Sequence, residues 1–139
     1  MRALLLHVNK FRADVTAPSN WPAGINPEKR QKAFEDMRDC IVAFFCVEKT
    51  DSQKQLTALY KEIIKTAKEV KTNKILISPF VHISRNIAEP AIAKKFYEQL
   101  MKKFEQTKYE LKSSHFGYHK TLLLDVKGHP GSFRYREFY

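Results

Sequence analysis

Residues 53–71 constrain the fold of this chain more than any other segment. Their apolar side chains recur at helical spacing, with lysines and glutamates on the opposite side, and these apolar residues are Leu56, Leu59, Ile63, Ala67 and Val70. The pattern predicts an amphipathic helix, which must bury one stripe against an apolar layer. Because strand-like segments lie before and after it, we expect the helix to pack on a β-sheet.

Several other segments have the length and apolar content of strands. The four clearest are residues 2–8, 41–47, 75–84, where Pro79 breaks the strand, and 121–126. Residues 11–15 alternate apolar and polar side chains, which predicts a hairpin with the first strand. Residues 109–113 predict one more strand, paired with the strand that follows Lys120.

Two further segments complete the prediction of helices. Residues 27–37 are rich in charge and predict a short helix. A second main helix is expected to begin at Pro90, because proline suits the first turn of a helix. Its buried stripe is expected to consist of Ile92, Phe96, Leu100 and Phe104. The predicted fold class is α/β, a single domain over residues 1–139 in which two main helices cover a mixed sheet.

The loop between the first two strand segments contains Pro18, Pro22, Gly24 and Pro27, which predicts an ordered loop or lid. Trp21 lies within it. We assign Trp21 to packing, with capping of a base or an adenosine as the alternative.

Length and composition point to a small globular protein. With 139 residues, 43% of them hydrophobic, the chain can bury a core, and no apolar run approaches the ~20 residues of a membrane span. The N-terminus lacks the pattern of a secretory signal, so we expect a cytoplasmic protein. Cys40 and Cys46 lie roughly 20 Å apart along one strand, beyond disulfide reach, and are expected to stay reduced and packed.

The formal net charge of +10 is the strongest compositional signal, with 25 Lys and Arg against 15 Asp and Glu. It favours a polyanionic partner, because lysines that neutralise phosphates release counterions. Solubility, or adaptation to a hot or salty habitat, is the alternative. The candidate tRNA-binding residues, on and around the second helix, are Lys94, Lys95, Lys102 and Lys103.

Two segments carry candidate site residues. Lys120 opens the apolar strand of residues 121–126 and shares a face with Leu122, Leu124 and Val126, which predicts an ammonium at the rim of a buried layer. A lysine that simply reaches solvent from a strand end is the alternative. His82 and Ser84 follow the strand broken by Pro79, and ligands of open α/β sheets bind beyond strand ends.

Other chemistries find less support. His115 and His119 have the spacing of a helical metal-ligand pair, but they lie on a turn and strand, where that spacing does not converge. Cys46 lies within an apolar run, unlike a reactive thiolate. Ser84 has no nucleophile-elbow motif around it, so we assign it to a turn or cap.

Four blocks of residues, in order along the chain, resemble one known family. They are the strand that opens at Met1, Val47-Glu48-Lys49, Pro79-Phe80-x-His82-x-Ser84, and Phe116-Gly117-Tyr118-x-Lys120 with Lys127-Gly128-His129-Pro130. The resemblance is to the archaeal threonyl-tRNA synthetase N-terminal editing domain, and only residues 17–39 look unlike it. It implies a fold similar to D-aminoacyl-tRNA deacylases and hydrolysis of serine wrongly attached to threonine tRNA.

The resemblance also implies roles for residues. Lys120 matches the family's active-site lysine, which implies water placement and oxyanion stabilisation, and His82 matches its pocket histidine, which implies substrate orientation. The implied substrate pocket comprises Phe80, Ser84, Phe116, Gly117, Tyr118 and His119. Because the adenosine 2′-hydroxyl and main-chain groups help to place the water, no metal or other cofactor is implied.

The sequence departs from the family at two positions. His119 stands where the family has a second aromatic residue, and Phe133 stands near a family glutamate. Glu137 is a candidate replacement for that carboxylate. These departures bear on the preference for serine more than on the ester chemistry.

Three functional hypotheses follow. The first is a freestanding aminoacyl-tRNA deacylase, the second an inactive tRNA-binding paralogue, and the third an accessory domain that docks to a separate threonyl-tRNA synthetase. A homodimer is also expected, because the related fold pairs two subunits and two helices cannot cover all the apolar strands.

Overall fold

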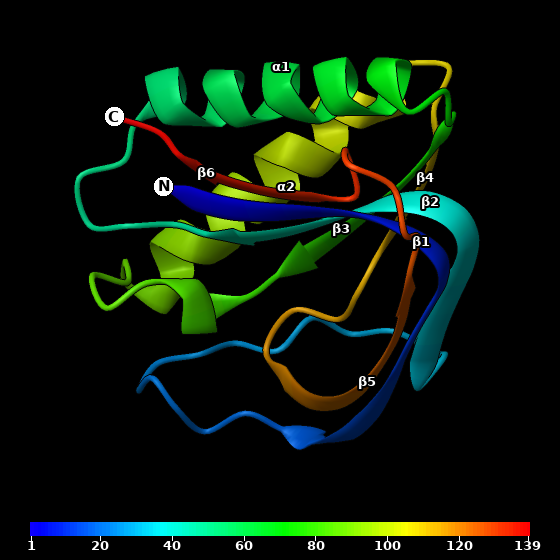
Figure 1. The fold of residues 1–139 in the computed structure, drawn as a ribbon. Coiled ribbons are helices and arrows are strands. Elements are labelled where there is room, and N and C mark those ends of the chain that lie inside the picture. The colour runs from blue at the N-terminus through cyan, green and yellow to red at the C-terminus, as the bar shows by residue number, and fades with distance from the viewer.

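A computed structural model describes residues 1–139. One six-stranded mixed sheet carries two helices on the same face (Figure 1). The elements in chain order are β1 (Arg2–Pro18), β2 (Phe34–Cys46), α1 (Gln53–Glu69), β3 (Lys74–Pro79), the single 3-10 turn η1 (Val81–Ile83), α2 (Pro90–Glu105), β4 (Glu110–Ser113), β5 (Tyr118–Val126) and β6 (Phe133–Glu137). The strand order is β4-β3-β2-β1-β5, and β6 pairs with β1 as well. The predicted α/β architecture is therefore confirmed.

Strand β1 is the centre of the sheet. It pairs with β2 from Arg2 to Asp14, while its other edge pairs first with β6 and then with β5. The prediction of a hairpin between residues 2–8 and 11–15 is wrong, because both segments belong to this one strand. A bulge between Val8 and Lys10 bends β1 where its partner changes, so the strand continues without a turn.

The prediction of a helix over residues 27–37 is also wrong. Phe34 to Met37 begin β2 and pair antiparallel with Asp14 to Phe11 of β1, and the residues before Phe34 are irregular. The charged side chains of this segment form ion pairs within the chain, some of them with residues distant in sequence, instead of the exposed face of a helix. Glu35, for example, forms an ion pair of 3.5 Å with Lys112, which comes from β4.

Strand β4 exists where it was predicted, but its expected partner was wrong. It pairs in parallel with β3 at the edge of the sheet, not with β5. The connection from β4 to β5 therefore crosses from one side of the sheet to the other, because β5 pairs with β1.

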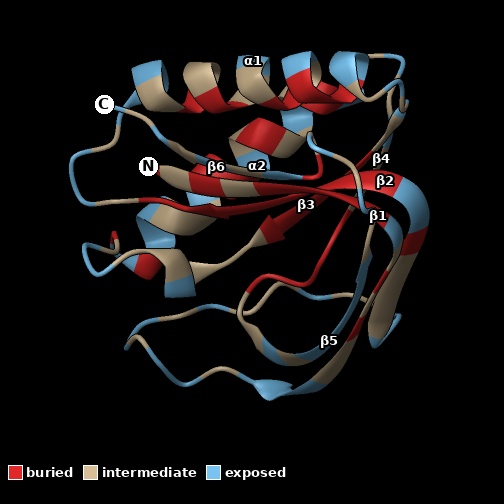
Figure 2. Cartoon of the chain, viewed as in Figure 1, coloured by how far each residue is buried: buried red, intermediate tan, exposed pale blue.

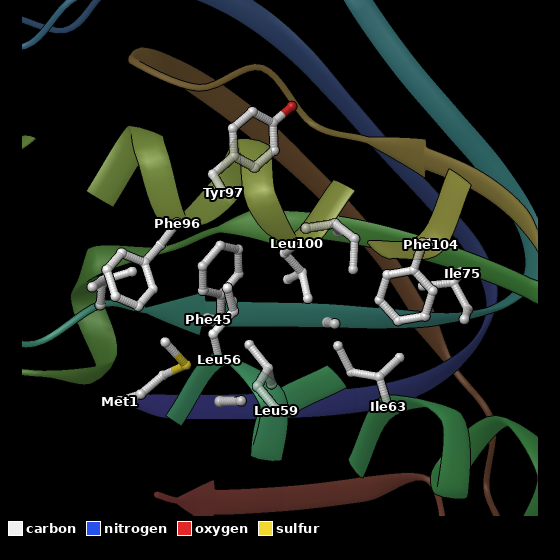
Figure 3. Packing of buried hydrophobic residues seen from close by; sticks show 14 of the residues in the cluster. Met1, Phe45, Leu56, Leu59, Ile63, Ile75, Phe96, Tyr97, Leu100 and Phe104 are labelled. Atoms are coloured by element: carbon white, nitrogen blue, oxygen red, sulfur yellow. The ribbon is translucent and has the colours of Figure 1, made fainter. Parts of the chain in front are cut away.

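The main core lies between the helices and the sheet (Figure 3). Helix α1 buries Leu56, Leu59, Ile63 and Ala67, as predicted, and its N-terminus is a capping box between Ser52 and Gln55. Helix α2 buries Phe96, Leu100 and Phe104, as predicted. Ile92 is 45% exposed, which corrects its assignment to the stripe. The stripe is rotated so that Pro90 and Tyr97 face inward instead.

A second, smaller core lies on the opposite face of the sheet, where β1 and β2 curl. Its members are Leu6, Val8, Phe11, Ala13, Met37, Cys40, Val42, Phe44 and Leu76. The expectation of a buried layer below Lys120 is wrong for β5, because Leu122 and Leu124 are 42% and 37% exposed (Figure 2). An apolar rim therefore borders this core.

Cys40 and Cys46 are free and buried, as predicted. Burial raises the pKa of the Cys40 thiol to about 12 and that of Cys46 to about 11, which disfavours the nucleophilic thiolate.

Neither main helix has the length and apolar character needed to cross a membrane.

A hydrogen bond between two histidine side chains joins the turn between β5 and β6 to β1. The Nδ1 atom of His7 lies 2.7 Å from Nε2 of His129, and the Gly131 amide donates to His129 Nδ1 at 3.2 Å. His129 therefore carries its proton on Nε2 and donates it to His7. Burial, followed by the charges of His129 and Lys127, lowers the pKa of His7 below its ordinary value, while Asp39 opposes this shift.

This pair predicts acid-sensitive stability. The folded protein binds a proton on His7 less readily than the unfolded chain, so stability is complete above about pH 6.5 and is lost as the pH falls through the lowered pKa of His7. Thermal unfolding at pH 7.5, 6.5, 5.5 and 5 would measure it. We expect His7→Gln, which can still accept the His129 proton, to reduce this dependence; parallel curves for the two proteins would contradict the assignment.

Candidate functional site

A cavity of about 360 Å³ opens at one edge of the sheet. It lies beyond the carboxyl ends of β2 and β3 and is closed by the first turn of α2, the loop after β1, and the turn that leads into β5. Its wall is mostly apolar, with Phe45, Val47 and Phe80 among its lining residues. Ligand sites of proteins have this character, with a few polar groups converging on an apolar cleft.

Most of the predicted pocket residues line this cavity. They are Phe80, His82, Phe116, Gly117, Tyr118, His119 and Lys120. His82 and Lys120 come from segments almost forty positions apart, so the fold brings together two residues that the sequence could only suggest separately.

Lys120 is held by the chain segment just before its own strand. Its ammonium donates to the Ser114 hydroxyl at 3.3 Å and to the His115 carbonyl oxygen. Burial lowers the pKa of Lys120 to about 8; Glu28 acts in the opposite direction, and Arg30 adds to the lowering. Lys120 is thus a cation at neutral pH, but one that loses its proton more readily than a surface lysine.

His82 lies on the rim of the cavity. Pro79 ends β3, and the chain turns through η1, where the exposed His82 ring packs edge-on against Phe80 with centroids 5.0 Å apart. Phe80 in turn packs on Phe44 of β2. The imidazole therefore packs on the aromatic pair of Phe80 and Phe44, and its exposed side can contact a ligand.

Ser84 does not line the cavity, which corrects its assignment to the pocket. Its hydroxyl donates to Glu48 at 2.5 Å and caps the amide of Asn86, as expected for a turn or cap residue. Glu48 also binds the Met1 ammonium and Arg2. Ser84 and Glu48 of the Val-Glu-Lys block therefore hold the start of β1 against the segment after β3.

The loop after β1, predicted as an ordered loop or lid, supplies one wall of the cavity. Trp21 is 64% exposed and lines the cavity, so its assignment to packing is wrong and the capping alternative gains support. Ile25 of the same loop is also in the wall. Three prolines and a glycine identified an ordered loop, but no local pattern could indicate which cavity it covers.

Gly117 joins this loop to the turn before β5. Its backbone has a φ of +84°, which favours glycine, and a β-carbon there would lie 2.7 Å from the α-carbon of Pro27. The carbonyl oxygen of Gly117 accepts the Ser19 amide at 2.8 Å. The loop after β1 and the turn before β5 are therefore in direct contact at this glycine.

The four candidate tRNA-binding lysines do not form one cluster. Lys94 and Lys95 lie in the first half of α2, beside a small depression of about 170 Å³ that shares Pro90 with the cavity. Lys102 and Lys103 are two turns further along the helix, roughly 12 Å from the first pair. Lys103 packs over the Tyr60 ring.

Residues considered for other chemistry are also accounted for. The buried His115 is hydrogen-bonded through Nε2 to the Lys32 carbonyl at 2.6 Å, whereas His119 is exposed. No group of three or more His, Cys, Asp or Glu side chains is placed to hold a metal ion. Glu137 accepts from the Tyr135 and Tyr139 hydroxyls and does not line the cavity.

Comparison with known proteins decides the family. Residues 1–138 match the family described as the archaea-specific editing domain of threonyl-tRNA synthetase. This chain belongs to that family. The threonine–tRNA ligase of Thermococcus gammatolerans is 33% identical over 135 residues, which cover 94% of this chain and 21% of the ligase. That of Pyrococcus furiosus is 31% identical with the same coverage. The editing domain described here thus spans about a fifth of the length of these relatives.

The fold is shared more widely than the sequence. The solved structure of the c-Myc DNA Unwinding Element Binding Protein covers 100% of this chain and 99% of its own, with a TM-score of 0.70 and 15% identity. At this identity the likeness concerns the fold alone. It confirms that the predicted α/β fold occurs in a solved structure over the whole length of this chain.

The contact at Gly117 yields a prediction with an internal control. Gly117→Ala should lower the free energy of unfolding by about 2 to 4 kcal/mol, from backbone strain and the clash with Pro27. Gly24→Ala has the same strain, with a φ of +83°, but no atom within 4 Å of the new β-carbon. It should cost only about 1 kcal/mol. Urea unfolding would measure both, and equal losses would exclude a tight contact at Pro27.

Proposed function

We propose that this chain is an aminoacyl-tRNA deacylase acting in trans. It removes a wrongly attached amino acid, serine in the first place, from the 3′-terminal adenosine of threonine tRNA. The observation that carries the proposal is that Lys120 and His82, from different parts of an editing-domain sequence, line the same cavity. A cytoplasmic location is part of the proposal.

The reaction is the hydrolysis of an activated ester. Water adds to the carbonyl carbon, the bond from that carbon to the ribose oxygen breaks, and the proton from water passes to the ribose oxygen. The Lys120 ammonium stabilises the negative charge that develops on the carbonyl oxygen, which is the step where a fixed cation contributes most. His82 and the aromatic wall orient the aminoacyl group, and a ribose hydroxyl helps to place the water.

The positive charge of the chain supports capture of tRNA without help from another domain. Lys94 and Lys95 line the small depression that shares Pro90 with the cavity, and the proposal runs the acceptor end of a bound tRNA past them. Lys102 and Lys103 extend the cationic path along α2. The second hypothesis, an inactive tRNA-binding paralogue, shares these contacts and differs from the first in turnover. The third, an accessory domain of a separate synthetase, differs in its partner.

Deacylation assays separate these hypotheses. The purified protein should hydrolyse seryl-tRNA for threonine faster than threonyl-tRNA, and EDTA should leave the rate unchanged. Lys120→Ala should lower the single-turnover rate about a hundredfold while tRNA affinity stays nearly constant, because its charge acts in the transition state. Wild-type turnover by Lys120→Ala would remove the support for its assigned role.

The matched control replaces lysines outside the cavity. Lys102→Ala combined with Lys103→Ala should weaken tRNA binding and lower its salt dependence by about one unit per lost phosphate contact, with little change in single-turnover rate at saturation. Filter binding at two salt concentrations would measure this. Salt-dependent binding without any turnover would select the inactive paralogue, and copurification of a synthetase would select the accessory domain.

We also propose that the protein is a homodimer. Leu122 and Leu124 of β5 and Phe133 and Tyr135 of β6 are exposed apolar side chains that border the second core. A second copy of the curled sheet would cover them. Light scattering at micromolar concentration should give twice the monomer mass, and Leu124→Lys with Tyr135→Lys should give the monomer mass. A monomeric wild-type protein would contradict this assembly.

A further inference from the structure

A cluster of polar side chains surrounds Arg30, next to the turn of residues 114–116 that holds the Lys120 ammonium. Glu28 and Arg30, from the loop between β1 and β2, form an ion pair of 2.9 Å. Arg30 also donates to Ser113, to its carbonyl oxygen at 2.6 Å and to its hydroxyl at 2.5 Å, and to the Tyr97 hydroxyl at 3.0 Å. The loop is thus tied to both β4 and α2.

Glu28 holds the turn before β5 through its side chain and its backbone. Its carboxylate accepts the Phe116 amide at 2.7 Å, and its own amide donates to the Phe116 carbonyl at 3.1 Å. The Tyr118 hydroxyl donates to the Glu28 carbonyl oxygen at 2.8 Å. Three hydrogen bonds therefore fix residues on both sides of Gly117 to this one glutamate.

The fixed turn is the one that holds the Lys120 ammonium. Ser114 and His115, whose oxygens accept from Lys120, immediately precede Phe116. The Ser114 hydroxyl is also hydrogen-bonded to Ser78 of β3 at 2.8 Å. A shift of the turn would thus move both acceptors of the ammonium.

Two charged groups act on Lys120, and both belong to this cluster. Glu28 raises its pKa and Arg30 lowers it, against the larger lowering by burial. The other titratable groups of this cluster are His115 and Tyr118, whose rings pack edge-on in the turn, and Tyr97 of α2, which stacks on Phe116, while His119 is exposed. Neither Phe133 nor Glu137, near the place of the family glutamate, lines the cavity.

We propose that Glu28 is a positioning residue for Lys120: it fixes the turn of residues 114–116, whose oxygens accept from the ammonium. Its carboxylate also acts on that ammonium at longer range, since Glu28 itself pairs with Arg30. This inference rests on the proposed function for its catalytic consequence. It assigns a role to the part of the sequence that least resembles the rest of the family.

The test uses Glu28→Gln, which keeps the size of the side chain and an oxygen for the Phe116 amide but removes the charge. Loss of that charge lowers the pKa of Lys120, so the ammonium is lost at lower pH. The rate of seryl-tRNA deacylation should therefore begin to decline at lower pH than in the wild-type protein, about fivefold slower at pH 8 and within about twofold at pH 6. The Michaelis constant should change little, because the cavity wall keeps its shape.

The matched control is Glu35→Gln. Glu35 is the other carboxylate beside Arg30, at 3.8 Å, but it makes no contact with the turn. Its replacement should leave the pH profile of deacylation unchanged. Arg30→Gln is a second variant with the opposite expectation, because removal of a positive charge raises the pKa of Lys120 and extends activity to higher pH. It keeps the test decisive if Glu28→Gln does not fold.

A readout without substrate keeps this inference separate from the proposed function. Titration of the Lys120 side chain by NMR in the full chain should give a lower midpoint in Glu28→Gln, a higher midpoint in Arg30→Gln and the wild-type midpoint in Glu35→Gln. These shifts in a protein that hydrolyses no aminoacyl-tRNA would refute the deacylase but support the link between Glu28 and Lys120. Equal midpoints in all four proteins would overturn the inference, whatever the activity.

Discussion

The pairing of β1 with three other strands is the constraint on which the rest of this structure depends. One edge of β1 pairs with β2. The other edge pairs with β6 up to Leu6 and with β5 from Val8 onward, next to a bulge. Because the strand bends there, the sheet has a flat half covered by the two helices and a curled half with its own small core. The cavity lies where the loop after β1 returns over the ends of β2 and β3.

The elements that could be predicted are those whose pattern is local. The apolar stripe of residues 53–71 specified α1, and Pro90 specified the start of α2. Strand pairing was harder, since residues 11–15 and 109–113 have strand patterns but nothing in them selects a partner. The charged residues 27–37 were misread as a helix because their ion pairs with Lys112 and with one another form only in the folded chain.

The same division holds for the site. The motifs around His82 and Lys120 identified two parts of the cavity wall, since each motif combines a strand end with unusual polar residues. Glu28 was not identified, because its role comes from contacts with Phe116 and Tyr118, which are distant in sequence. Trp21 was noted, but packing was preferred to capping because no local pattern shows that it lines the cavity. Ser84 was placed in the pocket by its nearness to His82 in sequence, while its hydroxyl in fact binds Glu48.

The position of Trp21 has an experimental consequence. It is the only tryptophan of the chain, and it is an exposed wall residue of the cavity. An indole that changes from water to the face of a bound nucleoside changes the intensity and wavelength of its emission. The unlabelled protein therefore carries its own optical signal for occupancy of the cavity, free of background from any other indole, and stopped-flow fluorescence can follow ligand entry separately from ester cleavage.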